Sequence, residues 1–230
     1  MRYWICVLTI VVVVVCIVWA IGLCIIPIKL DVLVVSPGGG GTTYVMGQLK
    51  AHTNLRMNSI SDRDRLKHIS FTRISNIRRV APKRILYLFN DPALAIESHF
   101  NRKWAQVQLD KLGNPYNLDY LDLKDGRQRF YTDCVDKGVD MYGIEQQFTV
   151  MTSGKLPCPV MCVDFAQFET VRTTVADFLG ISSDQLQAIR THKRNSSNVK
   201  MPTKYKEVYD SLYSRMKQFH GTVVQPRGNM

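Results

Sequence analysis

The sequence predicts an α/β domain, a parallel sheet flanked by helices with a P-loop-like phosphate-binding turn, preceded by an N-terminal transmembrane helix. Three observations predict this class. The chain begins with a long apolar segment. Short apolar runs rich in β-branched residues recur along the rest of the chain. A helical pattern follows each run, and such alternation is typical of a parallel sheet with helices on both faces.

The apolar segment predicts a membrane anchor over residues 1–28, with residues 29–230 forming one domain. Tyr3 to Ile26 contains no charged residue, and its 24 residues, at about 1.5 Å each, span the roughly 30 Å hydrocarbon layer of a bilayer. A cleaved signal peptide is the alternative, but its apolar core is shorter than this run. Arg2 precedes the segment, so we expect a single-pass type II membrane protein whose domain lies across the lipid bilayer from the cytoplasm.

The charge of the chain indicates an anionic partner. There are 30 Lys and Arg residues against 19 Asp and Glu residues, a net charge of +11. This balance suits a nucleotide, a sulfated or phosphorylated sugar, nucleic acid or a lipid surface, and a merely solvated basic surface is the alternative. Of these partners we expect an anionic nucleotide and no nucleic acid.

Three cysteines fall in the predicted domain, at positions 134, 158 and 162. Cys158 and Cys162 have no second Cys or His pair at zinc spacing, so no metal site is predicted. We favour buried free thiols, and a disulfide stays open as the alternative for a lumenal domain.

The clearest chemical signal is a glycine-rich turn between the first predicted strand and the first predicted helix. Leu30 to Ser36 reads as a buried strand that stops at Pro37, and residues 44–49 can form a helix. Such a turn points successive N–H groups into one concavity at a positive helix end, and therefore binds phosphate. It has no lysine, unlike the GxxxxGK[ST] loop, and a flexible turn is the alternative. The predicted phosphate-binding residues are Gly38, Gly39, Gly40, Gly41, Thr42 and Thr43.

The other predicted elements follow in chain order. Arg84 to Phe89 is a second buried strand, and Pro92 suits the first turn of the helix after it. Pro159 to Phe165 is the third strand, and Gly180 ends the amphipathic helix that follows. The predicted helices cover residues 93–103, 168–179 and 204–219, and residues 113–154 are expected to form helical or irregular insertions that line a substrate cleft.

In this context Gly41-Thr42-Thr43 resembles the loop of the sulfotransferase superfamily, which transfers a sulfuryl group from 3′-phosphoadenosine-5′-phosphosulfate (PAPS). The lysine and serine of the family loop fall on Gly39 and Gly40. Asn90-Asp91-Pro92, with Ser98 further on, resembles the family's 3′-phosphate motif, in which Asn90 replaces an arginine. The resemblance implies that Asn90 and Ser98 bind the 3′-phosphate of the donor.

Two later segments extend the resemblance over about residues 30–220. Phe178-Leu179-Gly180-Ile181 is similar to the end of a helix that is common in the family. Lys193 and Arg194 resemble part of the basic loop that closes over the nucleotide in Golgi members. The resemblance therefore adds Lys193 and Arg194 to the expected donor-binding residues.

The basic run from Arg65 to Ser70 resembles a segment that carries the general base in cytosolic members of the family. His68 is the predicted base, because a neutral imidazole with a pKa near 6.5 can accept the proton of an acceptor hydroxyl. A surface histidine in a charged run is the alternative interpretation. The other candidate bases are His99, Asp62 and Asp64, and the candidates to replace the missing loop lysine are Lys67, Arg65, Arg194 and Lys29.

The resemblance implies a Golgi-type membrane enzyme that transfers a sulfuryl group from PAPS to a carbohydrate hydroxyl without a metal. An inactive protein that keeps the fold as a binding module or scaffold is the first alternative, because the loop lysine and the arginine are missing. Another nucleotide-dependent transferase, for example a kinase-like one, is the second, since one loop architecture serves many phosphate donors.

Overall fold

Four strands form the sheet at the centre of the computed structural model, which describes residues 27–70, 77, 80–190 and 201–227. They lie in the order β1 (Leu33–Val35), β2 (Ile85–Phe89), β3 (Val160–Asp164) and β4 (Thr222–Val224). The first three are parallel, and β4 pairs antiparallel with β3. The carboxyl ends of β1, β2 and β3 therefore open on one edge of the sheet, where open α/β sheets bind their ligands.

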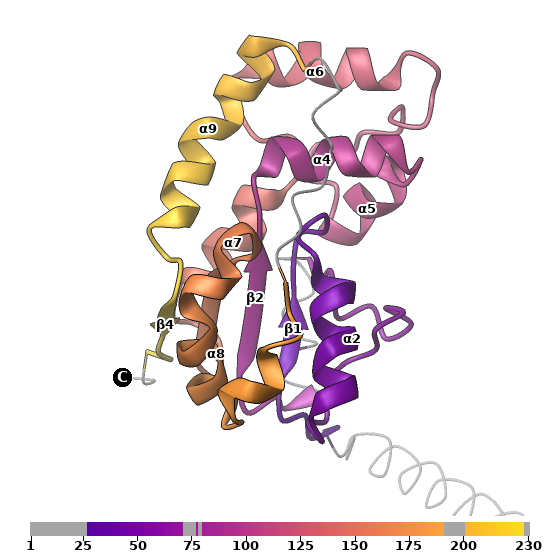
Figure 1. The fold of residues 1–230 in the computed structure, drawn as a ribbon. Coiled ribbons are helices and arrows are strands. Elements are labelled where there is room, and N and C mark those ends of the chain that lie inside the picture. Colours follow the sequence, from indigo (N-terminus) through magenta and orange to yellow (C-terminus); the bar gives the residue numbers. More distant parts are fainter. Residues whose placement is uncertain (1–26, 71–76, 78–79, 191–200, 228–230) are drawn as a thin grey trace, which may run out of the picture.

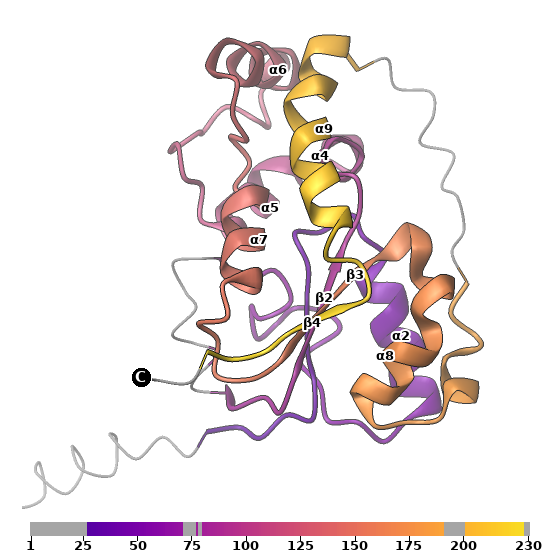
Figure 2. The ribbon, with the colours of Figure 1, turned by 90° about the vertical axis from the view of Figure 1, so that its left-hand side faces the viewer.

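Helices cover both faces of this sheet, as Figure 2 shows. One side carries α2 (Thr42–His52) and α8 (Arg172–Leu179), and the other carries α5 (Ala105–Leu112) and α7 (Ile144–Thr152). The predicted α/β class is therefore confirmed. The remaining helical elements are α4 (Pro92–Asn101), α6 (Gly126–Lys137), η2 (Phe165–Val171), η3 (Ser183–Leu186) and α9 (Thr203–Lys217).

The three parallel strands β1, β2 and β3 are buried on both faces, and their side chains alternate between two apolar cores. In β2, Ile85, Tyr87 and Phe89 join the larger core, whereas Leu86 and Leu88 join the smaller one. β1 and β3 alternate in the same way. This explains why the strands appear in the sequence as continuous apolar runs, which is the usual pattern of parallel strands covered by helices.

A helical layer lies beyond the carboxyl end of β2, where α4, α5, α6 and the upper part of α9 gather in Figure 1. Aromatic rings hold it together: Tyr205 of α9 contacts Phe130 and Tyr131 of α6, with ring centroids 6.2 and 4.4 Å away. This layer includes part of the segment 113–154, which was expected to form helical or irregular insertions that line a substrate cleft. The segment forms α6 and α7, which pack into the larger core.

The predicted elements differ from the observed ones in two places. The first four residues of the helix expected over residues 168–179 belong to η2, in which Gln167 has non-helical angles, and α8 covers the rest. Gly180 ends α8 in the left-handed conformation, as predicted. β4 was not predicted, because its three residues make too short a run to carry a pattern.

The predicted anchor lies outside the described residues for almost its whole length, since the description starts at residue 27. Within the described ranges, no helix is both long enough and apolar enough to cross a membrane.

The buried carboxylate of Asp140 forms hydrogen bonds that we expect to hold the helical layer to the rest of the domain. Its Oδ1 accepts hydrogen bonds from the Tyr142 amide at 2.8 Å and the Tyr209 hydroxyl at 3.0 Å, and its Oδ2 accepts one from the Glu145 amide at 2.7 Å. Asp140→Ala would leave buried donors without a partner, at a cost of about 3 kcal/mol in the free energy of unfolding. Urea denaturation followed by circular dichroism measures this loss.

The exposed Asp136, at the end of α6, provides the matched control. Asp136→Ala removes the same charge from a solvated position and is expected to change the unfolding free energy by less than about 0.5 kcal/mol. Equal losses in the two variants would mean that net charge, and not the hydrogen bonds of Asp140, stabilises this region.

Candidate functional site

The segment from Thr53 to Ser70 runs along the outer edge of β1 and brings two site residues to the glycine-rich turn. In this segment the carbonyl oxygen of Arg56 accepts hydrogen bonds from the backbone amides of Asp31 and Val32, at 2.8 and 3.2 Å. The side-chain amide of Asn58 then pairs with Val34, accepting from its N–H at 2.8 Å and donating to its carbonyl at 2.9 Å. These bonds cover the edge of the sheet and align the segment with the strand.

Ser36, the residue after β1, connects this segment to the turn. Its amide donates to Lys67 O at 2.9 Å, and its carbonyl accepts from His68 Nδ1 at 2.9 Å. Its hydroxyl oxygen accepts from the Gly38 amide at 3.1 Å and from the Thr42 hydroxyl at 2.6 Å. One buried serine therefore positions both the turn and the pair Lys67-His68.

The turn is closely packed, and this is why it consists of glycines. Gly38, Gly39 and Gly41 have φ angles of 94°, 71° and 71°, in the region that favours glycine. A Cβ at Gly39 would lie 2.7 Å from the backbone Cα of Ala95, and a Cβ at Gly38 would lie 2.6 Å from His99 Nε2. The turn therefore lies directly against α4, and no side chain fits between them.

The first turn of α2 faces the pocket with free backbone donors. Gly41 is its N-cap and supplies no side-chain cap, and no acidic residue lies in the first turn. The Thr42 hydroxyl donates to Ser36, so it is engaged in holding the turn, whereas the exposed Thr43 keeps its hydroxyl proton available. A positive helix end without an acidic cap attracts an anion.

Lys67 brings an ammonium group to this turn. Its Nζ donates to Thr43 Oγ1 at 3.2 Å and to Ile60 O at 2.6 Å. An ammonium group has three N–H bonds, so one remains for an anion in the pocket. Lys67 is only 6% exposed, and burial lowers its pKa from the ordinary value while nearby Asp62 raises it. Of the three candidates that the structure describes, Lys67 lines the pocket, whereas Arg65 is exposed and Lys29 lies before β1; Arg194 falls outside the described residues.

His68 lies beside the turn, half-buried, with its ring lining the pocket. A carbonyl oxygen can only accept, so the bond from Nδ1 to Ser36 O places the proton on Nδ1 and leaves Nε2 as an acceptor. Burial lowers the pKa of His68 to about 4, although the Ser36 carbonyl and Asp62 oppose this effect. At neutral pH the ring is therefore a neutral base.

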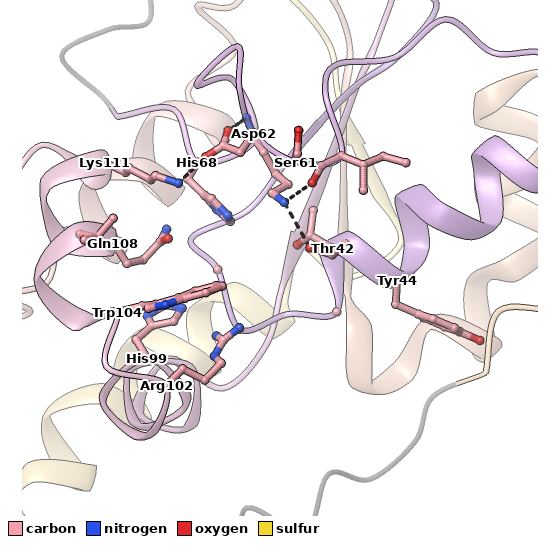
Figure 3. A pocket seen from close by; sticks show the side chains of 17 residues that line it. Thr42, Tyr44, Ser61, Asp62, His68, His99, Arg102, Trp104, Gln108 and Lys111 are labelled. Carbon is pink, nitrogen blue, oxygen red and sulfur yellow. Dashed lines mark hydrogen bonds and ion pairs between the residues drawn. The ribbon is translucent and has the colours of Figure 1, made fainter.

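The pocket between the turn, the segment 60–68 and α5 has a volume of about 480 Å³. In Figure 3, His68, Gln108, Lys111 and Trp104 point toward a common space that Thr42 bounds on the far side. The lining residues are Gly38, Gly39, Gly41, Thr42, Thr43, Tyr44, Ile60, Ser61, Asp62, Lys67, His68, His99, Arg102, Trp104, Val107, Gln108 and Lys111.

Polar contacts fix the walls of the pocket. Asp62 Oδ2 forms an ion pair with Lys111 Nζ at 2.7 Å, and Asp62 Oδ1 accepts from the Lys67 amide at 3.0 Å. Gln108 Nε2 donates to Pro37 O at 3.1 Å and so ties α5 to the turn. The position of Asp62 in an ion pair makes it a structural partner of the two lysines, not a free base.

His99, the alternative base, lies behind the turn. It is 2% exposed, and its Nδ1 donates to the Tyr142 hydroxyl at 3.0 Å, because that hydroxyl gives its own proton to Ala105 O at 2.9 Å. Burial lowers the pKa of His99 to about 3. Its close approach to Gly38 suits a role in supporting the turn. Asp64, another alternative, accepts the amides of Ser59 and Leu66 and holds its own loop.

The remaining predicted donor residues fall elsewhere. Asn90 and Ser98 are half-buried and lie outside the set that lines the pocket. The Asn90 side chain accepts from the Asp91 amide at 2.8 Å, and the Ser98 carbonyl accepts from Arg102 Nε at 2.9 Å. Lys193 and Arg194 lie outside the described residues. Gly40 faces the backbone of Phe89 instead of the pocket.

Sequence reasoning missed the wall formed by Arg102, Trp104, Gln108 and Lys111. Arg102 and Trp104 precede α5, and Gln108 and Lys111 lie within it, so the wall depends on the packing of α5 against the turn. The sequence carries one signal for them, an aromatic residue directly after two basic ones in Arg102-Lys103-Trp104. Such a pattern is common at ordinary surfaces.

The structure describes the three cysteines of the domain and allows a search for metal ligands among the described residues. There Cys134, Cys158 and Cys162 are buried free thiols, and burial raises their pKa values to about 12, 11 and 12. No cluster of three or more His, Cys, Asp or Glu side chains suited to a metal ion occurs among the residues that the structure describes.

No family model, no curated protein and no solved structure matches this chain. Any assignment of function therefore depends on the geometry and chemistry of the pocket.

The packing of the turn generates a prediction that compares two glycines of the same segment. Gly39→Ala would force a Cβ against Ala95 at a positive φ, so the unfolding free energy should fall by about 2 kcal/mol or more. Gly47→Ala, inside α2 with no atom within 4 Å of the added Cβ, should raise it by about 0.5–1 kcal/mol. Denaturant midpoints of the two variants measure both effects. A Gly39→Ala protein as stable as the wild type would contradict close packing of the turn on α4.

Proposed function

We propose that this protein transfers a sulfuryl group from PAPS to a hydroxyl group of a carbohydrate, with the glycine-rich turn as the donor site. One observation carries the proposal: an ammonium group and a neutral imidazole converge on the mouth of the turn, Lys67 through Thr43 and His68 through Ser36. The reaction needs a cation at the leaving oxygen and a base at the attacking one.

The donor site in this proposal combines three features of the described residues. The backbone of the turn and the first turn of α2 supply N–H donors for the 5′-phosphosulfate. Lys67 supplies the positive charge that the family places in the loop itself. Thr43 supplies a hydroxyl donor beside Lys67. Binding of the 3′-phosphate by Asn90 and Ser98, with Lys193 and Arg194 closing over the nucleotide, stays a prediction.

The transfer step follows from the tautomer of His68. The acceptor hydroxyl gives its proton to His68 Nε2 while its oxygen forms a bond to the sulfur of the donor. The bond from sulfur to the bridging oxygen breaks, and adenosine 3′,5′-bisphosphate leaves with the electron pair. Lys67 stabilises the charge that develops on the bridging oxygen. No metal takes part in these steps.

Membrane anchoring through residues 3–26 and a lumenal, Golgi-type location are part of the same proposal. The apolar N-terminal sequence and the resemblance support them, and the positive charge of the chain suits anionic partners in that setting.

A kinase-like activity is less well supported than sulfuryl transfer. The carboxylates at the ends of β2 and β3 are those of Asp91 and Asp164, and each caps the helical element that follows it. Asp91 accepts the amides of Ala93 and Leu94, and Asp164 accepts the Ala166 amide and the Tyr213 hydroxyl. These bonds engage Oδ1 of Asp91 and both carboxylate oxygens of Asp164, so each carboxylate already serves the fold.

Donor binding is the first test of the proposal. In isothermal titration, the full chain should bind adenosine 3′,5′-bisphosphate more tightly than AMP. Lys67→Gln should weaken this binding about 10–100-fold, because a hydrogen bond to a charged group contributes about 1.5–3 kcal/mol. Lys50→Gln, which removes an exposed charge at the end of α2, is the matched control and should bind as the wild type does. A chain that binds neither nucleotide would instead be the inactive scaffold.

His68 provides the second test, with a distinctive pH dependence. His68→Ala should lower kcat about 10²–10⁴-fold and leave bisphosphate affinity nearly unchanged. Because the base is active when neutral and its pKa is about 4, kcat/KM of the wild type should stay level from pH 8 to pH 5. A decline centred near pH 6.5 would show that His68 is an ordinary solvated histidine.

The stability of the fold must be followed in the same experiment. The folded state holds His68 and His99 with pKa values below that of a free histidine, so between about pH 4 and 6.5 the unfolded chain binds more protons. The unfolding free energy therefore decreases as the pH falls through this window. Circular dichroism at each pH separates loss of the fold from protonation of the base.

A further inference from the structure

Trp104 is an exposed aromatic residue inside a functional pocket. It lines the cavity beside the glycine-rich turn, yet the residue is 58% exposed. Its backbone is fixed, since its amide donates to His99 O and its carbonyl accepts from the Gln108 amide, both at 2.9 Å. The Arg102 guanidinium carbon lies 5.3 Å from the indole centroid. The ring is therefore held in place while much of its surface stays open to the cavity.

Val107, also on the pocket wall, adds to this apolar surface. It is 53% exposed and, with Trp104, is one of the few large exposed hydrophobic residues of the described chain. A concave site that exposes an aromatic ring and an aliphatic side chain gains free energy when a ligand covers them. The ring and Val107 thus indicate that part of the ligand has an apolar face.

Polar groups surround the apolar surface. The Asp62–Lys111 ion pair and Ser61 line the same cavity, and together they offer both donors and acceptors. His68 lies across the space from Trp104 in Figure 3. A ligand that fits must carry a flat apolar face, several hydroxyl groups at its rim and one hydroxyl near His68.

A pyranose ring has this combination of properties. Its axial C–H groups form an apolar face that stacks on an indole, and its equatorial hydroxyls point outward to polar partners. A phenol has the apolar face but only one hydroxyl, and a linear alcohol lacks the face. We infer that Trp104 is the platform on which a sugar ring of the acceptor stacks, with Val107 beside it, so that one ring hydroxyl meets His68. This inference rests on the proposed sulfuryl transfer and names the acceptor subsite.

Fluorescence tests the platform without measuring activity. The chain has three tryptophans, so the full chain with Trp4→Phe and Trp19→Phe keeps Trp104 as its single tryptophan. With saturating adenosine 3′,5′-bisphosphate, methyl glycosides of galactose, glucose and N-acetylglucosamine should change its emission in a saturable way, while phenol and cyclohexanol should not do so at the same concentrations. Saturation by phenol or cyclohexanol but by none of the glycosides would overturn the inference.

Kinetics with the responding glycoside provides the second readout. Trp104→Ala should raise the KM for the sugar about tenfold or more, with kcat changed much less, because stacking holds the ring and does not perform chemistry. Trp104→Phe should restore part of the loss. Leu123→Ala, at a residue that is 57% exposed but outside this pocket, is the matched control and should behave as the wild type does. Unchanged KM in Trp104→Ala would overturn the inference.

The two proposals fail in distinguishable ways. If the bisphosphate binds and no glycoside perturbs Trp104, the acceptor inference is wrong and donor binding stands. If a glycoside perturbs Trp104 and the bisphosphate does not bind, the sugar subsite stands and sulfuryl transfer from PAPS is wrong.

Discussion

The hydrogen bonds of Ser36 are the constraint on which the pocket depends. Its amide and carbonyl fix Lys67 and His68, and its hydroxyl oxygen fixes Gly38 and Thr42. The bond from the Ser36 amide to Lys67 O joins the backbone of the two segments just after β1, and the hydroxyl bonds begin the turn into α2. A side chain without a hydroxyl would leave a buried amide and a buried threonine hydroxyl without their acceptor, a cost of about 1–3 kcal/mol for each.

The close packing of the glycine-rich turn on α4 explains why the turn contains no lysine. A side chain at Gly39 would meet the backbone of Ala95, so a turn that lies directly against α4 excludes the lysine that the sulfotransferase resemblance places there. The segment beside β1 instead brings Lys67 to the other side of the turn, where its Nζ contacts Thr43. Burial around this position lowers the pKa values of both Lys67 and His68, because it disfavours the charged form of each group. The opposing Asp62 limits this effect for Lys67.

The sequence predicted the sheet and the turn well, because buried parallel strands and glycine runs are local signals. β1, β2 and β3 lie within the runs chosen for them, and His68, the predicted base, lies beside the turn. Other features depend on distant contacts. The pairing of Asn58 with Val34 and the wall formed by Trp104 and Lys111 arise only when segments far apart in the chain are packed together. β4 is three residues long and owes its place to the register with β3. Residue patterns alone cannot show such contacts.

Covering the edge of β1 with an irregular segment has a consequence for the dynamics of the protein. Lys67 and His68 are neighbours in that segment, which is joined to the strand by a few backbone bonds and one asparagine side chain. Such edges open by local unfolding at a lower free energy than the whole fold. A single opening event would remove the cation and the base from the turn together, while the sheet beneath stayed intact. The fraction of molecules with a complete pocket is thus set by the free energy of this local opening, which hydrogen exchange of the edge amides reports, and not by global stability.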